Sequence, residues 1–322
     1  MKRIAVALAF GALGWAAIPG VAGSAAAAGE GARREPTIVI DDVARFYRIY
    51  DAAGGHPTAD QLQHDYLDRG SEGLHHLAKV RNVTGATIAA AIAKRPDIYA
   101  NARSCMAVLP KVRRRAGVVL HRLIELYPEA KVAPVTIVVG RGRPVAIGGP
   151  GGEGVQFGLE ALCAVKWFNP NLEDRFVYGI AHEYVHVQQS PVVADDEHPT
   201  VLELAIVEGA AEFTAELISG AATEVTPHSV GFGPNTVSTR GRENDIETAF
   251  VADEDKTDLS QWFNNSTLEK PGDLGYWVGY RIVKSYYQHA PDKRQALREI
   301  LQMADPKAFL AKSSWKPGMH LR

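Results

Sequence analysis

Cysteine is scarce in this chain, and long apolar segments are absent beyond its N-terminal region. Only two of the 322 residues are cysteine, Cys105 and Cys163. In an exported protein such a pair suggests one disulfide, but the sequence leaves two free thiols equally open because it does not give the Cα separation. No stretch after residue 28 is long and apolar enough to cross a bilayer.

Charge of one sign is also lacking, and so are the glycine patterns that bind nucleotides. The formal net charge is −2, which gives no reason to expect nucleic acid or an anionic membrane as a partner. The glycines between Gly148 and Gly158 form neither a GxGxxG pattern nor a P-loop, and no suitable strand–loop–helix unit surrounds them. We therefore expect a flexible hairpin or a rim beside a cleft.

Residues 1–28 have the three-part pattern of a secretory signal peptide. Lys2 and Arg3 precede an apolar stretch from Ile4 to about Ile18, and small residues follow up to Ala28. The apolar part is short and rich in Ala and Gly, which favours a cleaved Sec-type signal over a membrane anchor. No cysteine lies near the expected cut after Ala28, so no lipidated N-terminus is expected. The sequence predicts a periplasmic or secreted protein without a stable membrane anchor.

Apolar periodicity predicts a mainly helical α+β fold. Helical spacing recurs from Ile40 to about Tyr127. Residues 135–139 are rich in β-branched side chains and predict a strand, with residues 145–147 as its expected partner in a small β-sheet. Individual helices are expected at 58–67, 84–93, 103–126, 173–189, 243–252, 259–263, 274–289, 293–303 and 306–311.

The chain after the signal peptide is expected to form a single domain, 29–322. Its N-terminal part, 29–130, is a predicted helical lobe, and residues 131–322 carry the candidate metal site. No linker-like boundary separates the two parts, which favours an integral lobe over a separable pro-segment.

The chemistry centres on His182-Glu183-Tyr184-Val185-His186, within the helix predicted at 173–189. Two histidines four residues apart project side by side from a helix, and their imidazoles can hold one Zn²⁺ ion. Glu183 is offset by one residue, so it can reach a water molecule at the ion, which is the general-base position of HExxH metallopeptidases. The helix buries a separate stripe, formed by Phe176, Ile180, Tyr184 and Val187.

A third ligand is expected from the next helix. The glycine and histidine of a metzincin motif are absent after His186, which excludes that class. Thr200 and Glu203 fit a capping box, so Glu203 is interpreted as structural. Glu208 and Glu212 lie four residues apart on one face, with Glu208 as the candidate ligand and Glu212 as a hydrogen-bond partner of a ligating histidine. Gly209 is expected to permit close packing of this helix against the motif helix.

These motifs resemble the gluzincin arrangement, in which an HExxH helix is followed by a helix that carries a glutamate ligand. More closely, the chain resembles a bacterial family of predicted zinc-dependent proteases related to gliding-motility lipoproteins. The matching segments are 46–51, 66–67, 70–71, 73–74, 182–186, 208–213, 275–281 and 309–313. One departure is the missing lipobox cysteine, which puts lipid anchoring in doubt.

The resemblance implies a zincin-like metallopeptidase domain, a single Zn²⁺ and hydrolysis of peptide bonds. Glu183 would take a proton from water and pass it to the leaving amine. A hydrogen-bond donor should stabilise the developing oxyanion, and Tyr276 and Tyr280 are the candidates, with His228 as an outside candidate. The resemblance favours the tyrosine-bearing segment but does not choose between its two tyrosines.

Two other functions are compatible with the sequence. One is a non-catalytic exported protein that keeps a vestigial zinc site and acts by binding a partner. The other is a helical interaction protein in which the HExxH pattern is accidental. Glu183 favours the enzyme, because a structural zinc site needs no base. Glu208 and Glu212 in the next helix argue against a chance occurrence of the HExxH pattern. The expected partner is a peptide or protein substrate, and the sequence does not indicate an oligomeric state.

Overall fold

A four-stranded mixed sheet lies among the helices of the chain. The computed structural model describes residues 35–143, 146–150, 154–165, 169–194, 196–220, 239, 241–265 and 272–321. The strands are β1 (Ile38–Val39), β2 (Val135–Val138), β3 (Ala146–Ile147) and β4 (Val155–Gly158), in the order β1-β2-β4-β3. β1, β2 and β4 run parallel, whereas β3 pairs antiparallel with β4. Every residue of β2 and β4 is buried, as expected for central strands covered on both faces.

The sheet corrects one expectation drawn from the sequence and adds a strand that was not expected. β3, which belongs to the expected partner segment, does not pair with β2, because β4 lies between them. The second half of the glycine segment is strand β4, which pairs antiparallel with β3. Val155, Gln156 and Phe157 alternate apolar and polar side chains, but three residues are too few for this pattern to predict a strand. The backbone is extended because neighbours on both sides supply hydrogen-bond partners.

Helices make up most of the described residues, which confirms the mainly helical α+β class. In the first half they are α1 (Asp41–Ala52), α2 (Ala59–Gln61), the π-helix η1 (Leu62–Leu67), α3 (Glu72–Val80), α4 (Gly85–Lys94), α5 (Pro96–Ala102), the 3₁₀-helix η2 (Arg103–Val108), α6 (Leu109–Leu126) and α7 (Leu159–Ala164). In the second half they are α8 (Leu172–His186), α9 (Pro191–Ala194), α10 (Val201–Ser219), α12 (Glu243–Asp253), α13 (Leu274–His289), α14 (Lys293–Leu301) and α15 (Pro306–Lys312).

Three expected helices differ from the structure. The helix predicted at 58–67 is divided into the short α2 and the π-helix η1. The long helix predicted at 103–126 is divided, with a 3₁₀ segment before α6. Pro110 explains the division, because proline donates no N–H and its ring clashes with the carbonyl four residues earlier. The segment at 259–263 is a turn and not a helix: the Asp258 carboxylate accepts the backbone N–H of Ser260, and Asn264 adopts a positive φ of 58°.

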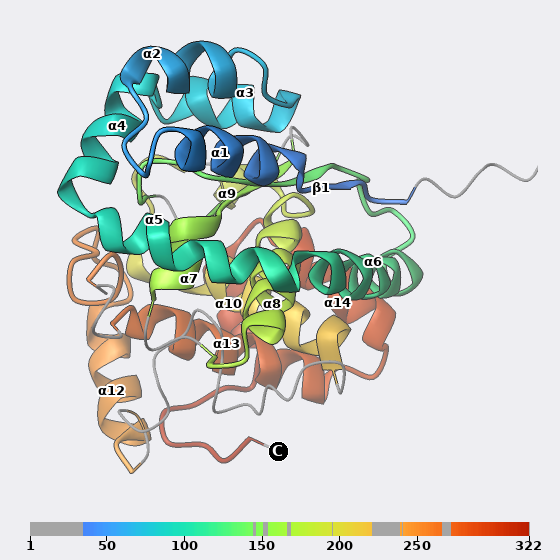
Figure 1. The fold of residues 1–322 in the computed structure, drawn as a ribbon. Helices are drawn as coiled ribbons and strands as arrows, with labels where there is room; N and C mark the ends of the chain where they lie inside the picture. The colour runs from blue at the N-terminus through green and yellow to red at the C-terminus, as the bar shows by residue number, and fades with distance from the viewer. Residues whose placement is uncertain are drawn as a thin grey trace, which may run out of the picture. The chain divides into compact units, whose positions relative to one another are not determined.

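The N-terminal helices and the motif helix lie on different sides of the sheet. Figure 1 shows α1 to α4 above the strands and α8, α10 and α13 below them. Helices α1 and α3 contact β2, while α8 contacts β3 and β4. Residues Glu35–Arg322 form one compact unit, whereas residues 1–34, which include the expected signal peptide, lie outside the described part of the chain.

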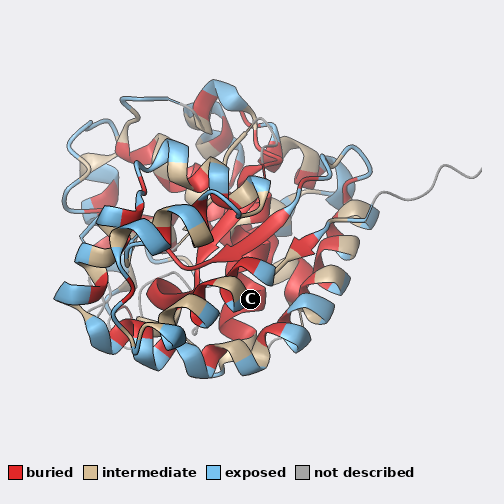
Figure 2. Cartoon of the chain, turned by 45° about the horizontal axis from the view of Figure 1, so that its top comes forward, coloured by how far each residue is buried: buried red, intermediate tan, exposed pale blue. Residues whose placement is uncertain are grey.

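The interior contains two hydrophobic clusters, and the central strands of the sheet stand out as buried in Figure 2. The first joins the N-terminal helices to the sheet and to α8, so the predicted lobe packs into the same core as the motif helix. The Tyr66 hydroxyl strengthens this junction, since it bonds both the N–H and the C=O of Val139 at 2.8 Å. The second cluster joins α10 to the C-terminal helices.

A disulfide between Cys105 and Cys163 links η2 to α7, with a Cα–Cα distance of 6.6 Å. The structure thus decides between the two alternatives that the sequence left open. Among the described residues, no helix combines the length and apolar character needed to cross a membrane.

Candidate metal centre

Helix α8 presents two different faces to its surroundings. Asn171 caps its N-terminus, where the side chain accepts the N–H of Asp174 at 3.2 Å. The predicted stripe of Phe176, Ile180, Tyr184 and Val187 is fully buried in the first cluster. The opposite face carries the two motif histidines toward α10, so the local helical period places both on one side.

Helix α10 begins at the predicted capping box. The N–H of Glu203 bonds Thr200 Oγ1 at 3.2 Å, and the N–H of Thr200 bonds Glu203 Oε2 at 2.6 Å. This confirms the structural interpretation of Glu203. The expectation for Gly209 was wrong, because it packs against the backbone of Gly279 in α13 and not against α8.

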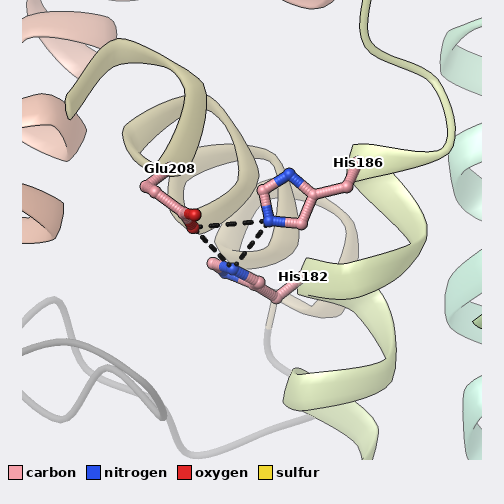
Figure 3. Close-up of side chains that lie close together, drawn as sticks. All are labelled: His182, His186 and Glu208. Atoms are coloured by element: carbon pink, nitrogen blue, oxygen red, sulfur yellow. Dashed lines mark hydrogen bonds and ion pairs between the residues drawn. The ribbon is translucent and has the colours of Figure 1, made fainter. Parts of the chain in front are cut away.

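Three ligand atoms converge between α8 and α10 (Figure 3). The Nε2 atoms of His182 and His186 lie 3.2 Å apart. Glu208 Oε2 lies 3.3 Å from Nε2 of His182 and 3.4 Å from Nε2 of His186. Both histidines are buried, with exposed fractions of 2% and 9%. Within the described ranges, this is the one group of three or more His, Cys, Asp or Glu side chains with metal-ligand geometry.

The other ring nitrogen of each histidine faces an acceptor. Nδ1 of His182 lies 3.3 Å from Glu212 Oε1, and the other oxygen of Glu212 accepts the Tyr178 hydroxyl at 2.6 Å. Nδ1 of His186 lies 2.8 Å from Gln189 Oε1. A neutral imidazole that donates through Nδ1 has its lone pair on Nε2. Both lone pairs therefore point toward Glu208.

This arrangement brings together three acceptors and leaves a place for a cation. Glu208 Oε2 is buried and accepts no hydrogen bond from any described residue. Two imidazole nitrogens and one carboxylate oxygen are the donor set of catalytic zinc sites in which one position stays open. The residues present therefore fit a zinc ion on the chemistry of their donor atoms and on the orphaned carboxylate oxygen.

Protons compete with a cation for the same atoms. Burial acts to lower the pKa of His182, but Glu208 and Glu212 outweigh it and raise this pKa to about 10. Burial likewise opposes ionisation of Glu208, yet the two histidines hold the pKa of its carboxyl well below the usual range. Both shifts favour a proton on His182 and a charged Glu208 when no cation is bound, so a cation must displace that proton to bind.

Glu183 lies at the edge of this group. Burial raises the pKa of its carboxyl, which is the direction that suits a group that must accept a proton near neutral pH. The backbone of Gly148 runs directly against Glu183: a Cβ at position 148 would lie 2.6 Å from the Glu183 carbonyl oxygen and 3.2 Å from Oε2. Gly148 thus lies directly beside the candidate base, and a side chain at this position would displace Glu183.

The two candidate tyrosines occupy different surroundings. The ring of Tyr276 stacks on His182, with centroids 6.1 Å apart and an interplanar angle of 23°. The Tyr280 hydroxyl instead donates to Glu216 and accepts from Lys284 Nζ at 2.8 Å. Tyr276 therefore lies against a candidate ligand. Tyr280 instead contacts Glu216, one helical turn beyond Glu212 in α10. His228 lies outside the described residues.

Two further residues belong to the site and were not singled out from the sequence. Tyr178 precedes His182 by one helical turn and bonds Glu212. Gln189 follows His186 by three residues and bonds its ring. In the sequence, these two residues could have been found only by their spacing of three or four residues from a histidine. That spacing does not show which side chains reach the ring.

The comparisons with known proteins concern the C-terminal helices. A family model described as "Gliding motility protein GldB" matches residues 243–317, which extend from α12 past α15. No curated protein and no solved structure was found to match the chain. The matched segment includes Tyr276 but not the HExxH helix. Over these residues, the chain is similar to a gliding-motility family, in agreement with the relation expected from the sequence.

Proposed function

We propose that this chain is an exported, zinc-dependent metallopeptidase of the gluzincin type, with a zincin-like fold. The convergence of His182 Nε2, His186 Nε2 and Glu208 Oε2 carries the proposal. Export is inferred from the N-terminal pattern of the sequence and implies a periplasmic or secreted protein. The substrate class is a peptide or protein.

Each residue of the group has a chemical task in this proposal. His182, His186 and Glu208 would hold Zn²⁺, which when bound would polarise the substrate carbonyl and lower the pKa of water to about 7. Glu183 takes the proton from the attacking water and passes it to the leaving amine. Tyr276, stacked on His182, is the better placed of the two tyrosines to donate a hydrogen bond to the oxyanion.

Electrostatics of the buried group support this division of tasks. The pKa of the Tyr276 phenol is raised, by burial first and then by Glu208 and other nearby carboxylates, so it stays protonated as a donor. The raised pKa of the Glu183 carboxyl makes it a better base than an exposed glutamate. Glu212 fixes the ring of His182 and is itself held by Tyr178.

A non-catalytic zinc protein is the second candidate. It is favoured by the similarity of residues 243–317 to a gliding-motility family, since that similarity excludes the HExxH helix. In a non-catalytic protein of this kind, the zinc site is vestigial and the C-terminal helices bind a partner. Glu183 separates the two candidates, because only the enzyme uses a base beside the ion.

The test begins with zinc stoichiometry by elemental mass spectrometry on the chain from Gly29 and on its Glu208→Ala variant. About one zinc per chain, lost in the variant, is expected; a parent that takes up no zinc after reconstitution would exclude both candidates. Hydrolysis of a broad peptide library then distinguishes them. Glu183→Gln should retain zinc and lose turnover by at least about 10²-fold, and undiminished turnover would remove Glu183 as the base.

A further inference from the structure

Gln189 makes two hydrogen bonds that connect the candidate ligands of two helices. It lies just beyond the end of α8 and is 4% exposed. Its Oε1 is 2.8 Å from His186 Nδ1, and its Nε2 donates to the carbonyl oxygen of Val207 at 2.7 Å. Val207 directly precedes Glu208 in α10. One amide group therefore bridges the ring of one candidate ligand and the backbone beside another.

The chemistry of the partners fixes the orientation of this amide. A backbone carbonyl can only accept, so the NH₂ group of Gln189 must face Val207. The amide oxygen must then face His186, and Nδ1 must donate to it. Consequently Nδ1 of His186 carries a hydrogen, and in the neutral ring the lone pair lies on Nε2, which points toward His182 and Glu208.

We propose that Gln189 is a positioning residue of the candidate metal centre. It selects the metal-binding tautomer of His186 and holds the end of α8 in register with Glu208. The inference rests on the proposed zinc site, since a tautomer matters there only if Nε2 binds a cation. Hydrogen bonds from ligating histidines to a second partner generally set ring orientation and ligand basicity.

A neutral amide suits this position because the surroundings are already negatively charged. Glu183, Glu208 and Glu212 all contribute negative charge around the two rings. His182 already has a carboxylate partner in Glu212, whereas His186 has an amide. Another carboxylate would place one more negative charge in this buried group, and a buried charge is costly unless it is paired. Gln189 orients His186 without adding that charge.

The neighbouring Gln188 is a matched control. It is 1% exposed, and its amide also makes two kinds of hydrogen bond. Its Oε1 accepts the N–H of Lys131 at 2.7 Å, and its Nε2 donates to the carbonyls of Lys131 and Tyr184. The Gln188 side chain therefore ties α8 to the segment before β2, and its hydrogen-bond partners among the described residues do not include the candidate ligands.

The experiment compares Gln189→Met with Gln188→Met in the chain from Gly29. Affinity for Zn²⁺ is measured by competition with a chromophoric chelator, and Co²⁺ substitution provides a visible spectrum that reports ligand geometry. Gln189→Met should weaken zinc binding by about 10- to 100-fold and alter the cobalt spectrum. Gln188→Met should keep both the affinity, within about threefold, and the spectrum, even if it costs stability.

Two further variants and two outcomes distinguish a failure of the positioning role from a failure of the zinc site. Gln189→Ala removes the same bonds without the larger thioether and replaces Gln189→Met if that variant does not fold. Gln189→Glu keeps an acceptor toward Nδ1 and should recover part of the lost affinity. Parental affinity and spectrum in the variants that remove the amide, or equal losses in Gln188→Met, would overturn the positioning role alone. A parent chain that binds neither metal would overturn the proposed zinc site and this inference with it.

Discussion

Gly209 of α10 and Gly279 of α13 meet backbone to backbone. A Cβ added at Gly209 would lie 2.0 Å from the carbonyl carbon of Gly279, and one added at Gly279 would lie 1.7 Å from the carbonyl oxygen of Ala205. Gly209 is next to Glu208, and Gly279 lies one turn beyond Tyr276. The close approach of the two helices therefore sets the distance between a candidate ligand and a candidate oxyanion donor.

We expect Gly279→Ala to destabilise the protein, because its methyl group would push α13 away from rigid backbone. Overpacking of this kind costs about 1–3 kcal/mol of unfolding free energy, and backbone contacts place this site at the upper end. Urea unfolding of the metal-free chain measures the effect. Gly117→Ala is the matched control: a Cβ there meets nothing within 4 Å, so helix propensity alone should stabilise it by about 0.5–1 kcal/mol. Equal effects of the two substitutions would contradict the packing argument.

The two tyrosines of α13 should differ in their kinetic effects. Tyr276→Phe removes the hydroxyl of the ring that stacks on His182 and is expected to lower kcat by about 10²–10³-fold with little change in KM, as for the loss of an oxyanion donor. Tyr280→Phe breaks the contacts with Glu216 and Lys284 and should change kcat by less than about threefold. Steady-state kinetics on a substrate from the peptide library provides the comparison. The reverse order of effects would transfer the donor role to Tyr280.

As the pH rises, the metal-free chain should lose stability, whereas the stability that zinc adds should grow. In the metal-free chain, Glu208 and Glu212 outweigh burial and raise the pKa of His182 to about 10, above its unfolded value of about 6.5. Its stabilising contribution is complete below pH 6.5 and is lost as the pH rises toward 10. Zinc requires the deprotonated ring, so the stability added by zinc should grow over the same interval.

Urea unfolding at pH 6.5, 7.5 and 8.5, with chelator or with excess zinc, tests this pH dependence. The His182→Gln variant is the control, since it should lack the decline attributed to His182 in the metal-free series. Metal-free stability that rises with pH in the parent as much as in His182→Gln would disagree with the expected sign.

The disulfide should contribute to stability without affecting the metal site. It closes a loop with a sequence separation of 58 between η2 and α7. The loop-entropy model then assigns it about 4 kcal/mol of unfolding free energy. The double variant Cys105→Ser/Cys163→Ser should lose stability of this order in urea unfolding and keep the zinc stoichiometry of the parent. Loss of zinc in a folded double variant would mean that the disulfide positions α8.

The sequence by itself determined the features that depend on neighbours along one helix. The four-residue spacing of His182 and His186 put both rings on one face, because an α-helix repeats every 3.6 residues. The same spacing put Glu208 and Glu212 together, and the Thr200 capping box identified the start of their helix. These features follow from local hydrogen bonding, so a single stretch of sequence contains all the information they require.

Only the tertiary structure decided which distant segments meet. It placed β4 between β2 and β3, paired Gly209 with α13, joined the two cysteines, and directed Tyr276 but not Tyr280 toward His182. Strand order and helix contacts depend on how side chains from remote segments fill a shared core, and residue spacing does not record this. Gln189 illustrates the limit: its three-residue distance from His186 is visible in the sequence, but its second bond, to Val207, exists only because α8 and α10 pack side by side.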